Sequence, residues 1–388
     1  MWSSGPVWVA TFAVLVCAVT LVSIGLAALR LKRRRPAFLT QEPSPAVTIV
    51  RPVCGLETFS EETLRAGFLL DHPEYELVFC VDSSADPVIP LVRRLMAEYP
   101  AVPSRLLVGE DRISANPKLN NCVKGWEAAR HDWVILADSN VLMPTDYVAH
   151  LKAAWRDNTG LVCSTPVGSR PDGFWSELEC AFLNTLQARW QYAGEALGLG
   201  FAQGKSMLWY RPFLEARGGI RALGVEIAED AAATKLVRRA GLRVHLVDSP
   251  FEQPLGPRRP GDVWARQLRW ARLRRVTFPL FFAPELLTGP AVPALCLGAA
   301  TAALGGSATF AVGTLLAIWY GAEAALAWRM RWHLSWRMPA AFLVRDLLIP
   351  AMWFSAYLTQ NVTWRGNVMH VTTKGGDADA LAPSSSGA

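Results

Sequence analysis

Three aspartates and one basic, tryptophan-containing segment are the residues of this sequence best placed to do chemistry. Asp82 ends the apolar run ELVFCVD, Asp138 ends the run ILAD, and Asp230 stands at the start of a helical pattern. Ligands of open α/β sheets bind beyond the carboxyl ends of the strands, so Asp82 and Asp138 are placed where a ligand would sit. Taken alone, each aspartate is more often a turn, cap or helix-terminal residue. Their order along the chain makes them candidates.

The basic segment is VWARQLRWARLRR, residues 263–275, which holds five arginines and two tryptophans. A solvated helix face is the ordinary explanation of such a charge run. In a helix, however, Arg266, Arg269 and Trp270 fall within about 100° of one another, whereas Arg272 and Arg275 point elsewhere. Some of the charge must therefore face a negative group. Localised basic charge suits anionic lipid headgroups or a phosphorylated substrate, and no nucleic-acid-binding motif accompanies it.

The composition indicates a membrane protein with a sizeable soluble part, because 51% of the 388 residues are hydrophobic and only 19% are charged. Residues 7–29 carry no charge and can span a bilayer, and RLKRRR follows directly. A cleaved signal peptide is disfavoured, since no basic segment precedes the run, the run is too long and no clear cleavage site follows. The positive-inside rule predicts an N-terminus outside and residue 36 onward in the cytoplasm.

Residues 46–285 are predicted to form one soluble α/β domain with a mostly parallel sheet, because strand and helix patterns alternate. The predicted strands are 48–52, 76–82, 105–110, 133–139 and 160–166. The predicted helices lie near 86–99, 118–130, 144–157, 175–193 and 229–240. The stretch FAQGKSMLWYR, residues 201–211, has two interpretations: a loop near a bound substrate, or a buried strand after a glycine turn.

The C-terminal region is predicted to return to the membrane. Residues 290–304 and 308–328 are expected to cross it, with GGS as the turn between them and the basic loop 329–337 inside. A third apolar segment, 340–360, is interrupted by Arg345, Asp346 and Pro350, and could re-enter or lie in the interface instead of crossing. The expected organisation is thus an anchor with a basic flank (1–35), the soluble domain (46–285), a membrane or interfacial region (286–370) and a disordered tail (374–388).

Several classes of chemistry have no support in the sequence. The seven cysteines are odd in number and show no CxxC spacing, which predicts buried thiols in a reducing compartment. The six histidines show no metal spacing. The sequence contains no GxSxG, P-loop or GxGxxG motif, which argues against a hydrolase, a P-loop NTPase and a Rossmann dehydrogenase.

The three aspartates, followed by Arg266-Gln-Leu-Arg269-Trp270, resemble the pattern of inverting nucleotide-sugar glycosyltransferases with a GT-A fold. More narrowly, the chain resembles the ceramide glucosyltransferase family over roughly residues 46–370. The single span at the N-terminus and the hydrophobic C-terminus are similar too. The stretches that carry the resemblance are VTIVRPVCGLE, LDHPEYELVFCVDSSADP, NPKLNN, ILADSN, AED, RQLRWARLRR and TWRG (363–366).

On the donor side, the resemblance implies a UDP-sugar and a divalent metal, Mg²⁺ or Mn²⁺. Asp138 would help hold the metal, Asp82 would contact the uridine, and Lys118 of NPKLNN would lie near the nucleotide. The motif here is DSN instead of DxD, so Asp138 is the one carboxylate available to the metal, and Asn140 is a candidate second ligand. One carboxylate suffices in principle, since Mg²⁺ keeps several waters and takes phosphate oxygens.

On the acceptor side, the resemblance implies transfer of a hexose, most simply glucose, to the primary hydroxyl of ceramide with inversion. Asp230 would take the proton of that hydroxyl, with Glu229 as a neighbour and not the base. Arg266 and Arg269 would face the diphosphate, and Trp270 would line the acceptor side. The remaining arginines would meet lipid phosphates at the bilayer surface: Arg272, Arg274 and Arg275.

Alternatives remain open at this point. The acceptor could be diacylglycerol or a hopanoid polyol, and the donor UDP-galactose or UDP-glucuronate. Ala- and Arg-rich usage suggests a GC-rich bacterial genome, and with the membrane segments this predicts a bacterial inner-membrane protein. Processive polysaccharide synthases share a QxxRW motif, but they carry more membrane helices, and Arg266 stands here in the first position. A non-catalytic membrane scaffold is disfavoured because the three aspartates and both motif arginines are present.

Overall fold

The computed structural model describes residues 4–32, 44–359, 361–364 and 367–370. Three parts of the sequence predictions lie outside these residues: positions 33–35 of the basic flank, positions 365 and 366 of TWRG, and the tail 374–388. The chain forms two compact units, each built from separate stretches of sequence. The sheet unit comprises Arg35–Thr165, Gly200–Phe251 and Gln360–Ala388, and the helical unit comprises Met1–Arg34, Pro166–Leu199 and Glu252–Thr359.

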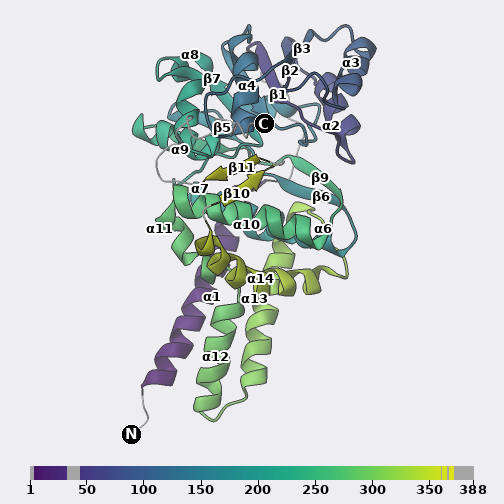
Figure 1. Ribbon diagram of the computed structural model, residues 1–388. Helices are drawn as coiled ribbons and strands as arrows, with labels where there is room; N and C mark the ends of the chain where they lie inside the picture. The colour runs from purple at the N-terminus through teal and green to yellow at the C-terminus, as the bar shows by residue number, and fades with distance from the viewer. Residues whose placement is uncertain (1–3, 33–43, 360, 365–366, 371–388) are drawn as a thin grey trace, which may run out of the picture. The chain divides into compact units, whose positions relative to one another are not determined.

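The sheet unit is built around a seven-stranded, mostly parallel sheet (Figure 1). Its strands are β1 (Val47–Pro52), β2 (Tyr75–Val81), β3 (Ser104–Val108), β4 (Trp133–Ala137), β5 (Thr159–Cys163), β7 (Ser206–Tyr210) and β8 (Arg243–Leu246). Their order is β3-β2-β1-β4-β7-β5-β8, and β7 runs antiparallel to both of its neighbours. The five predicted strands are all confirmed. They are apolar runs because strands covered on both faces bury every position, as β1 and β2 do.

The helices of the sheet unit confirm the sequence periodicity, and two of them, α4 and α9, carry a candidate site residue as their second residue. They are α2 (Ser60–Ala66), α3 (Ile89–Glu98), α4 (Pro117–Glu127), α5 (Tyr147–Ala153), α8 (Arg211–Glu215) and α9 (Glu229–Arg239), with short 3₁₀ turns at Gly67–Leu69 and Gly219–Val225. The start of α4 is well determined, because Asn116 caps the backbone N–H groups of Lys118 and Leu119 and Pro117 occupies the first turn. A two-stranded antiparallel ladder, β10 (Asn361–Trp364) with β11 (Asn367–His370), completes the unit.

The packing of α4 on the sheet depends on a glycine. A Cβ added at Gly125 would lie 2.5 Å from Val50 Cγ1 of β1 and 2.6 Å from Cys80 Sγ of β2. We expect Gly125→Ala to lower the free energy of unfolding by about 1–3 kcal/mol, because the methyl group must displace core atoms. Thermal unfolding of the purified protein in detergent measures this. Gly261→Ala is the control, since an added Cβ there meets nothing within 4 Å; equal melting temperatures for the two variants would contradict the expectation.

The helical unit combines long apolar helices with shorter ones. It contains α1 (Gly5–Arg30), α6 (Phe174–Ala181), the π-helical turn η2 (Phe182–Ala188), α7 (Arg189–Ala196), α10 (Pro260–Thr277), α11 (Pro279–Phe282), the 3₁₀ turn η4 (Ala283–Leu287), α12 (Ala291–Ala303), α13 (Ala308–Met330) and α14 (Met338–Leu358). A parallel strand pair, β6 (Val167–Asp172) with β9 (Glu252–Pro257), belongs to the same unit. Within this unit α1 packs against α12 and α13 (Figure 1).

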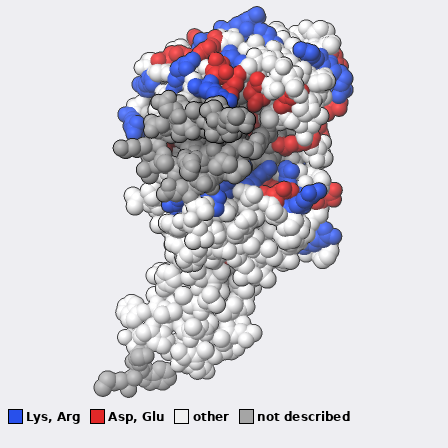
Figure 2. All heavy atoms as spheres, viewed as in Figure 1, with Lys and Arg blue, Asp and Glu red and all other residues white. Residues whose placement is uncertain are grey.

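Three helices of the described residues are long and apolar enough to cross a membrane: α1, α13 and α14. The segment 290–304 contains α12, whose 13 residues extend about 20 Å, less than the hydrocarbon thickness of about 30 Å. α12 is long and apolar enough to cross a membrane only together with Pro279–Leu287, and the two helices of that pair are bent by 47°. On the face shown in Figure 2, no charged residue is visible over the end of the helical unit where α1, α12 and α13 lie.

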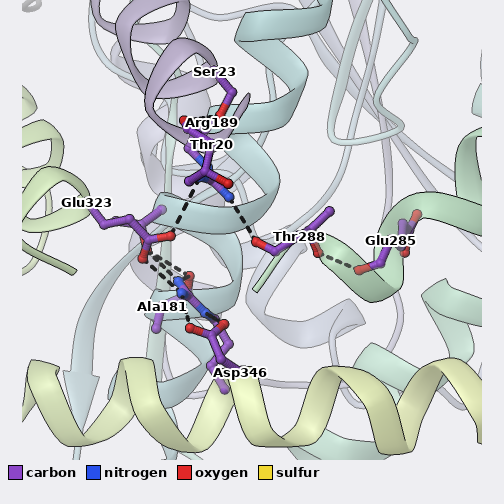
Figure 3. Close-up of polar contacts among 10 residues, drawn as sticks. Thr20, Ser23, Ala181, Arg189, Glu285, Thr288, Glu323 and Asp346 are labelled. Atoms are coloured by element: carbon purple, nitrogen blue, oxygen red, sulfur yellow. Dashed lines mark hydrogen bonds and ion pairs between the residues drawn. The ribbon is translucent and has the colours of Figure 1, made fainter. Parts of the chain in front are cut away.

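The charges that interrupt the 340–360 segment are buried inside the helical unit, in a cluster with two positive and two negative side chains (Figure 3). Arg345 donates to Glu323 Oε2 and Asp346 Oδ2, each at 2.8 Å, and to Thr185 Oγ1 at 2.8 Å. Arg189 Nη1 lies 3.7 Å from Glu323 Oε1. The four charges balance and none of these side chains is accessible to solvent. α14 runs as one helix through Arg345 and Asp346 and on through Pro350.

Candidate active site

A cluster of charged side chains lies at the carboxyl end of β4 in the sheet unit. Lys118 Nζ lies 2.6 Å from Asp138 Oδ1 and 2.8 Å from Glu229 Oε1. Lys205 Nζ lies 2.8 Å from Asp138 Oδ2 and donates to Asn140 Oδ1 at 3.0 Å. Each oxygen of the Asp138 carboxylate thus faces one lysine ammonium group. The structure thereby brings together two predicted site residues, Asp138 and Lys118.

The backbone explains why these residues meet. β7 pairs antiparallel with β4, and the Asp138 N–H donates to the Lys205 carbonyl at 3.0 Å, so this register delivers Lys205 to the carboxyl edge of β4. Gly204 directly precedes Lys205, and its carbonyl oxygen accepts a hydrogen bond from Lys118 Nζ. A Cβ at Gly204 would lie 2.6 Å from Glu229 Oε1 and 3.0 Å from Lys118 Nζ, so a larger residue there would require both charged groups to move.

The cap of α4 ties the cluster to α9. Asn116 accepts hydrogen bonds from the backbone of α4 through Oδ1, and its Nδ2 donates to Glu229 Oε2 at 2.6 Å. Glu229, the first residue of α9, is buried. The carboxylate of Glu229 therefore joins the helices that carry Lys118 and Asp230. Glu229 has a structural role in the site, which its sequence position beside Asp230 did not reveal.

The electrostatics distinguish Asp138 from Asp230, and the charge of Lys118 acts on both carboxyl groups. Burial acts to raise the pKa of Asp138, but Lys118 and Lys205 together outweigh it and hold that pKa well below its usual range. Burial, and then the Glu229 carboxylate, raise the pKa of Asp230 to about 7, against the opposing charge of Lys118. The carboxyl of Asp138 is therefore held ionised while that of Asp230 titrates near neutral pH, a division that suits an ion-binding role and a proton-accepting role.

Asp138 and Asn140 are the oxygen donors available for a divalent metal here. Among the described residues, no three His, Cys, Asp or Glu side chains are grouped so that they could hold a metal by themselves. An ionised carboxylate with an amide oxygen nearby nevertheless fits a hard cation that keeps waters and takes phosphate oxygens as further ligands. The donor set is thus compatible with Mg²⁺ or Mn²⁺ in company with a diphosphate.

Asp82 lies at the same edge of the sheet. It follows β2, and β1 lies between β2 and β4 in the sheet order. Its side chain is exposed, and its Oδ1 accepts a hydrogen bond from the Ser83 N–H at 2.7 Å. Asp82 is therefore fixed in a turn and accessible to a ligand at the carboxyl edge.

The RxxRW residues belong to the helical unit, on α10. Arg266 Nη1 lies 2.5 Å from Oε1 of Glu179, which is fully buried on α6. Arg258 Nε approaches the other oxygen of Glu179 at 3.3 Å. Glu179 therefore orients two arginines, a function that the sequence patterns missed. The two acids inside the otherwise apolar stretch FWSELECAFL, Glu177 and Glu179, were the available signal.

The remaining residues of α10 have other surroundings within the helical unit. Trp270 is partly buried against a small apolar cluster formed by Cys180, Leu183 and Leu255. Arg274 forms a two-point contact with Glu285, at 2.6 and 2.8 Å, and the Arg275 guanidinium lies 5.2 Å from the centre of the Tyr357 ring.

This mixed α/β sheet, with its acids at the carboxyl edge, is the GT-A fold of nucleotide-sugar glycosyltransferases. A solved structure with a similar fold is the mannosyltransferase PcManGT from Pyrobaculum calidifontis in complex with GDP-Man and Mn²⁺, with a TM-score of 0.52 and 19% identity over 88% of this chain and 99% of that one. The chain belongs to glycosyl transferase family 21, whose model matches residues 10–377. It is therefore a sugar-nucleotide-dependent glycosyltransferase, as the motifs indicated.

Curated relatives narrow the family further. Ceramide glucosyltransferase 3 of Caenorhabditis elegans is 26% identical over 338 residues, which cover 85% of this chain and 74% of the relative. Ceramide glucosyltransferase 1 of the same organism is 25% identical over 330 residues, or 83% and 71% of the two chains. These matches confirm the resemblance to ceramide glucosyltransferases.

Proposed function

We propose that this chain transfers glucose from UDP-glucose to the primary hydroxyl of ceramide with inversion. Relatives named ceramide glucosyltransferase match it over most of its length. The observation that carries the chemistry is the combination of an ionised Asp138 with an Asp230 whose pKa is raised to about 7, both of them acted on by the charge of Lys118. The former suits the donor diphosphate and its cation, and the latter suits a general base.

On the donor side, Asp82 contacts the uridine and Asp138 holds Mg²⁺ or Mn²⁺, which when bound supplies positive charge against the departing diphosphate. Lys118 lies between Asp138 and Glu229, so its ammonium group is already fixed beside the place where that negative charge develops. For Arg266 and Arg269 we propose a role in binding the diphosphate, and within the helical unit Glu179 holds the Arg266 guanidinium in its orientation.

On the acceptor side, the ionised Asp230 accepts the proton of the ceramide hydroxyl while the hydroxyl oxygen attacks the anomeric carbon. The bond from that carbon to the diphosphate oxygen breaks, and its electron pair leaves with UDP. A single displacement of this kind inverts the anomeric centre without a sugar–enzyme bond. Trp270, partly buried among apolar side chains, lines the acceptor side.

We infer that the protein lies in a bacterial inner membrane with its N-terminus outside and its catalytic part in the cytoplasm. Basic residues support this orientation, since Arg30 ends α1 and Arg329 stands in the last turn of α13. These two helix ends are neighbours, because Arg329 donates to the Ala28 carbonyl at 3.4 Å. Positive charge therefore gathers at one end of two membrane helices, as the positive-inside rule requires of a cytoplasmic end.

The test uses membranes from cells that express the full chain, supplied with Mg²⁺ or Mn²⁺ and radiolabelled UDP-glucose. Ceramide, diacylglycerol and a hopanoid polyol are offered separately, and lipid products are separated by chromatography. Label in glucosylceramide alone is the expected result. Label only in another lipid would overturn the acceptor assignment, and label only in an insoluble polymer would favour a polysaccharide synthase.

A further inference from the structure

We propose that α14 does not cross the membrane but lies along its surface, with one apolar face of the helix in contact with lipid. The helix is long and apolar enough to span a bilayer, so its composition alone does not decide between the two arrangements. The decision comes from where the two ends of the helix lead and from which of its side chains are exposed. It does not depend on the sugar or the acceptor that the protein uses.

Both ends of α14 lead to the same side of the membrane. The chain enters α14 from α13, whose last turn lies beside the last turn of α1, because Arg329 donates to the Ala28 carbonyl at 3.4 Å. After α1 the chain continues into β1, and after α14 it continues into β10, which begins at Asn361. Both strands belong to the sheet unit, and one compact unit lies on one side of a membrane. A single helix that crossed would instead end on the opposite side from its start.

One face of α14 is buried within the helical unit. Arg345 and Asp346, the two charged residues of the helix, lie on this face in the balanced cluster (Figure 3). Phe342, Ile349 and Met352 are buried as well, and the helix packs on α6 and α10. Figure 1 shows α14 running across the direction of α12 and α13. The helix therefore presents no charged side chain to its surroundings.

The opposite face of α14 is an exposed apolar stripe. It is formed by Leu343, Leu347, Phe354 and Leu358, which are between 44% and 79% exposed. At 100° per residue, these four side chains fall within about 60° of one another. Water disfavours a continuous apolar stripe of this kind. A helix that lies in the interface plane buries such a face at the boundary between headgroups and acyl chains without crossing the bilayer.

The turn from α13 into α14 has the composition of a membrane surface. Trp328 and Trp336 are exposed, and so is Arg331. The guanidinium of Arg337, the residue before α14, lies 5.1 Å from the centre of the Trp336 ring. Tryptophan is enriched at the level of the headgroups, and arginine is attracted to anionic lipids. The stripe continues from this turn, so its occupant is lipid of the same leaflet.

The first experiment locates the end of α14 with a membrane-impermeant maleimide that carries polyethylene glycol. Full chains with Thr359→Cys, Arg93→Cys or Ala303→Cys are compared with the wild type in right-side-out and inverted vesicles, and each labelled thiol adds one band shift. Arg93 is exposed on α3 of the sheet unit, and Ala303 is the exposed last residue of α12. We expect Thr359→Cys to be labelled in the same vesicles as Arg93→Cys, and Ala303→Cys in the other preparation.

The second experiment identifies what covers the stripe. Benzoylphenylalanine, which forms cross-links to neighbouring C–H groups on illumination, replaces Phe354 in the full chain in lipid vesicles. The same probe at Phe310, an exposed position of α13, serves as the membrane reference, and at Leu56, exposed in the sheet unit, as the control away from lipid. Mass spectrometry should show the added mass of one phospholipid at Phe354 and Phe310, and none at Leu56.

Each result decides one part of the proposal. Labelling of Thr359→Cys together with Ala303→Cys would show that α14 crosses the membrane and would overturn its placement at the surface. A cross-link from position 354 to a second copy of the chain, seen as a dimer band, would overturn lipid as the occupant, and so would the absence of any adduct. Neither readout uses UDP, ceramide or turnover, so a failure here leaves the proposed function standing.

Discussion

Asp230→Asn should lower turnover about 10³-fold while UDP binding stays close to that of the wild type, because a general base contributes roughly 10²–10⁴ to the rate. The amide is similar in size but cannot accept the proton of the acceptor hydroxyl. Initial rates with UDP-glucose and ceramide, together with UDP calorimetry, measure the two quantities. Glu226→Gln is the control, since it removes a carboxylate from the segment just before α9. Turnover of Asp230→Asn within tenfold of the wild type would exclude Asp230 as the base.

The pH dependence gives this prediction a second readout. With the pKa of Asp230 raised to about 7, kcat/KM of the wild type should rise as pH increases through 7, and this limb should be absent in Asp230→Asn. Stability should change in the opposite sense. The folded chain holds the Asp230 proton more tightly than an unfolded chain with a pKa of about 3.9, so this contribution to the free energy of unfolding is complete below about pH 4 and is lost as pH rises through about 7.

Arg345→Met should destabilise the protein by about 3–5 kcal/mol, the usual cost of removing one partner from a buried ion pair. Arg345 contacts Glu323 and Asp346, all of them inaccessible to solvent, so the variant leaves two buried carboxylates with Arg189 as the remaining cation of the cluster (Figure 3). Thermal unfolding in detergent and the amount of protein in membranes should both fall.

Two further variants separate charge imbalance from lost packing. Arg345→Met combined with Asp346→Asn leaves one acid and one base, Glu323 and Arg189, and should recover part of the lost stability. Arg94→Met removes an exposed arginine from its pair with Glu61 at 2.9 Å and should cost less than about 1 kcal/mol. A double variant no more stable than Arg345→Met would show that charge balance is not what the cluster provides.

Much of the sheet unit could be predicted from the sequence, because its strands are covered on both faces and therefore appear as apolar runs. What periodicity could not show was the pairing of those strands. The stretch 201–211 remained either a loop or a strand until β7 was seen to pair antiparallel with β4. That pairing alone brings Lys205 to Asp138. In the helical unit, the apolar composition predicted where α12 lies in the sequence but not how long it is. Its length is determined by the breaks in the helix before Ala291 and after Ala303.

The candidate site was predictable where a residue type follows directly from the chemistry. Asp138 and Lys118 were expected near the nucleotide, and the structure places their charged groups 2.6 Å apart. The supporting residues were missed because their contacts join distant parts of the chain: Asn116 with Glu229, and Glu179 with Arg266. Such partners carry no local pattern, apart from a charge in an otherwise apolar helix.

The interleaving of the two units along the chain has a consequence for biosynthesis. Since α1 packs on α12 and α13, the first helix to leave the ribosome must wait in the membrane until nearly the whole sheet unit has been synthesised. The helices of residues 166–199 emerge between the two major stretches of the sheet unit, yet they complete their packing only with α10 and α14. Contacts between segments so far apart in sequence form slowly. Early chains therefore expose apolar helix faces, and deletion of the last helices would make that exposure permanent.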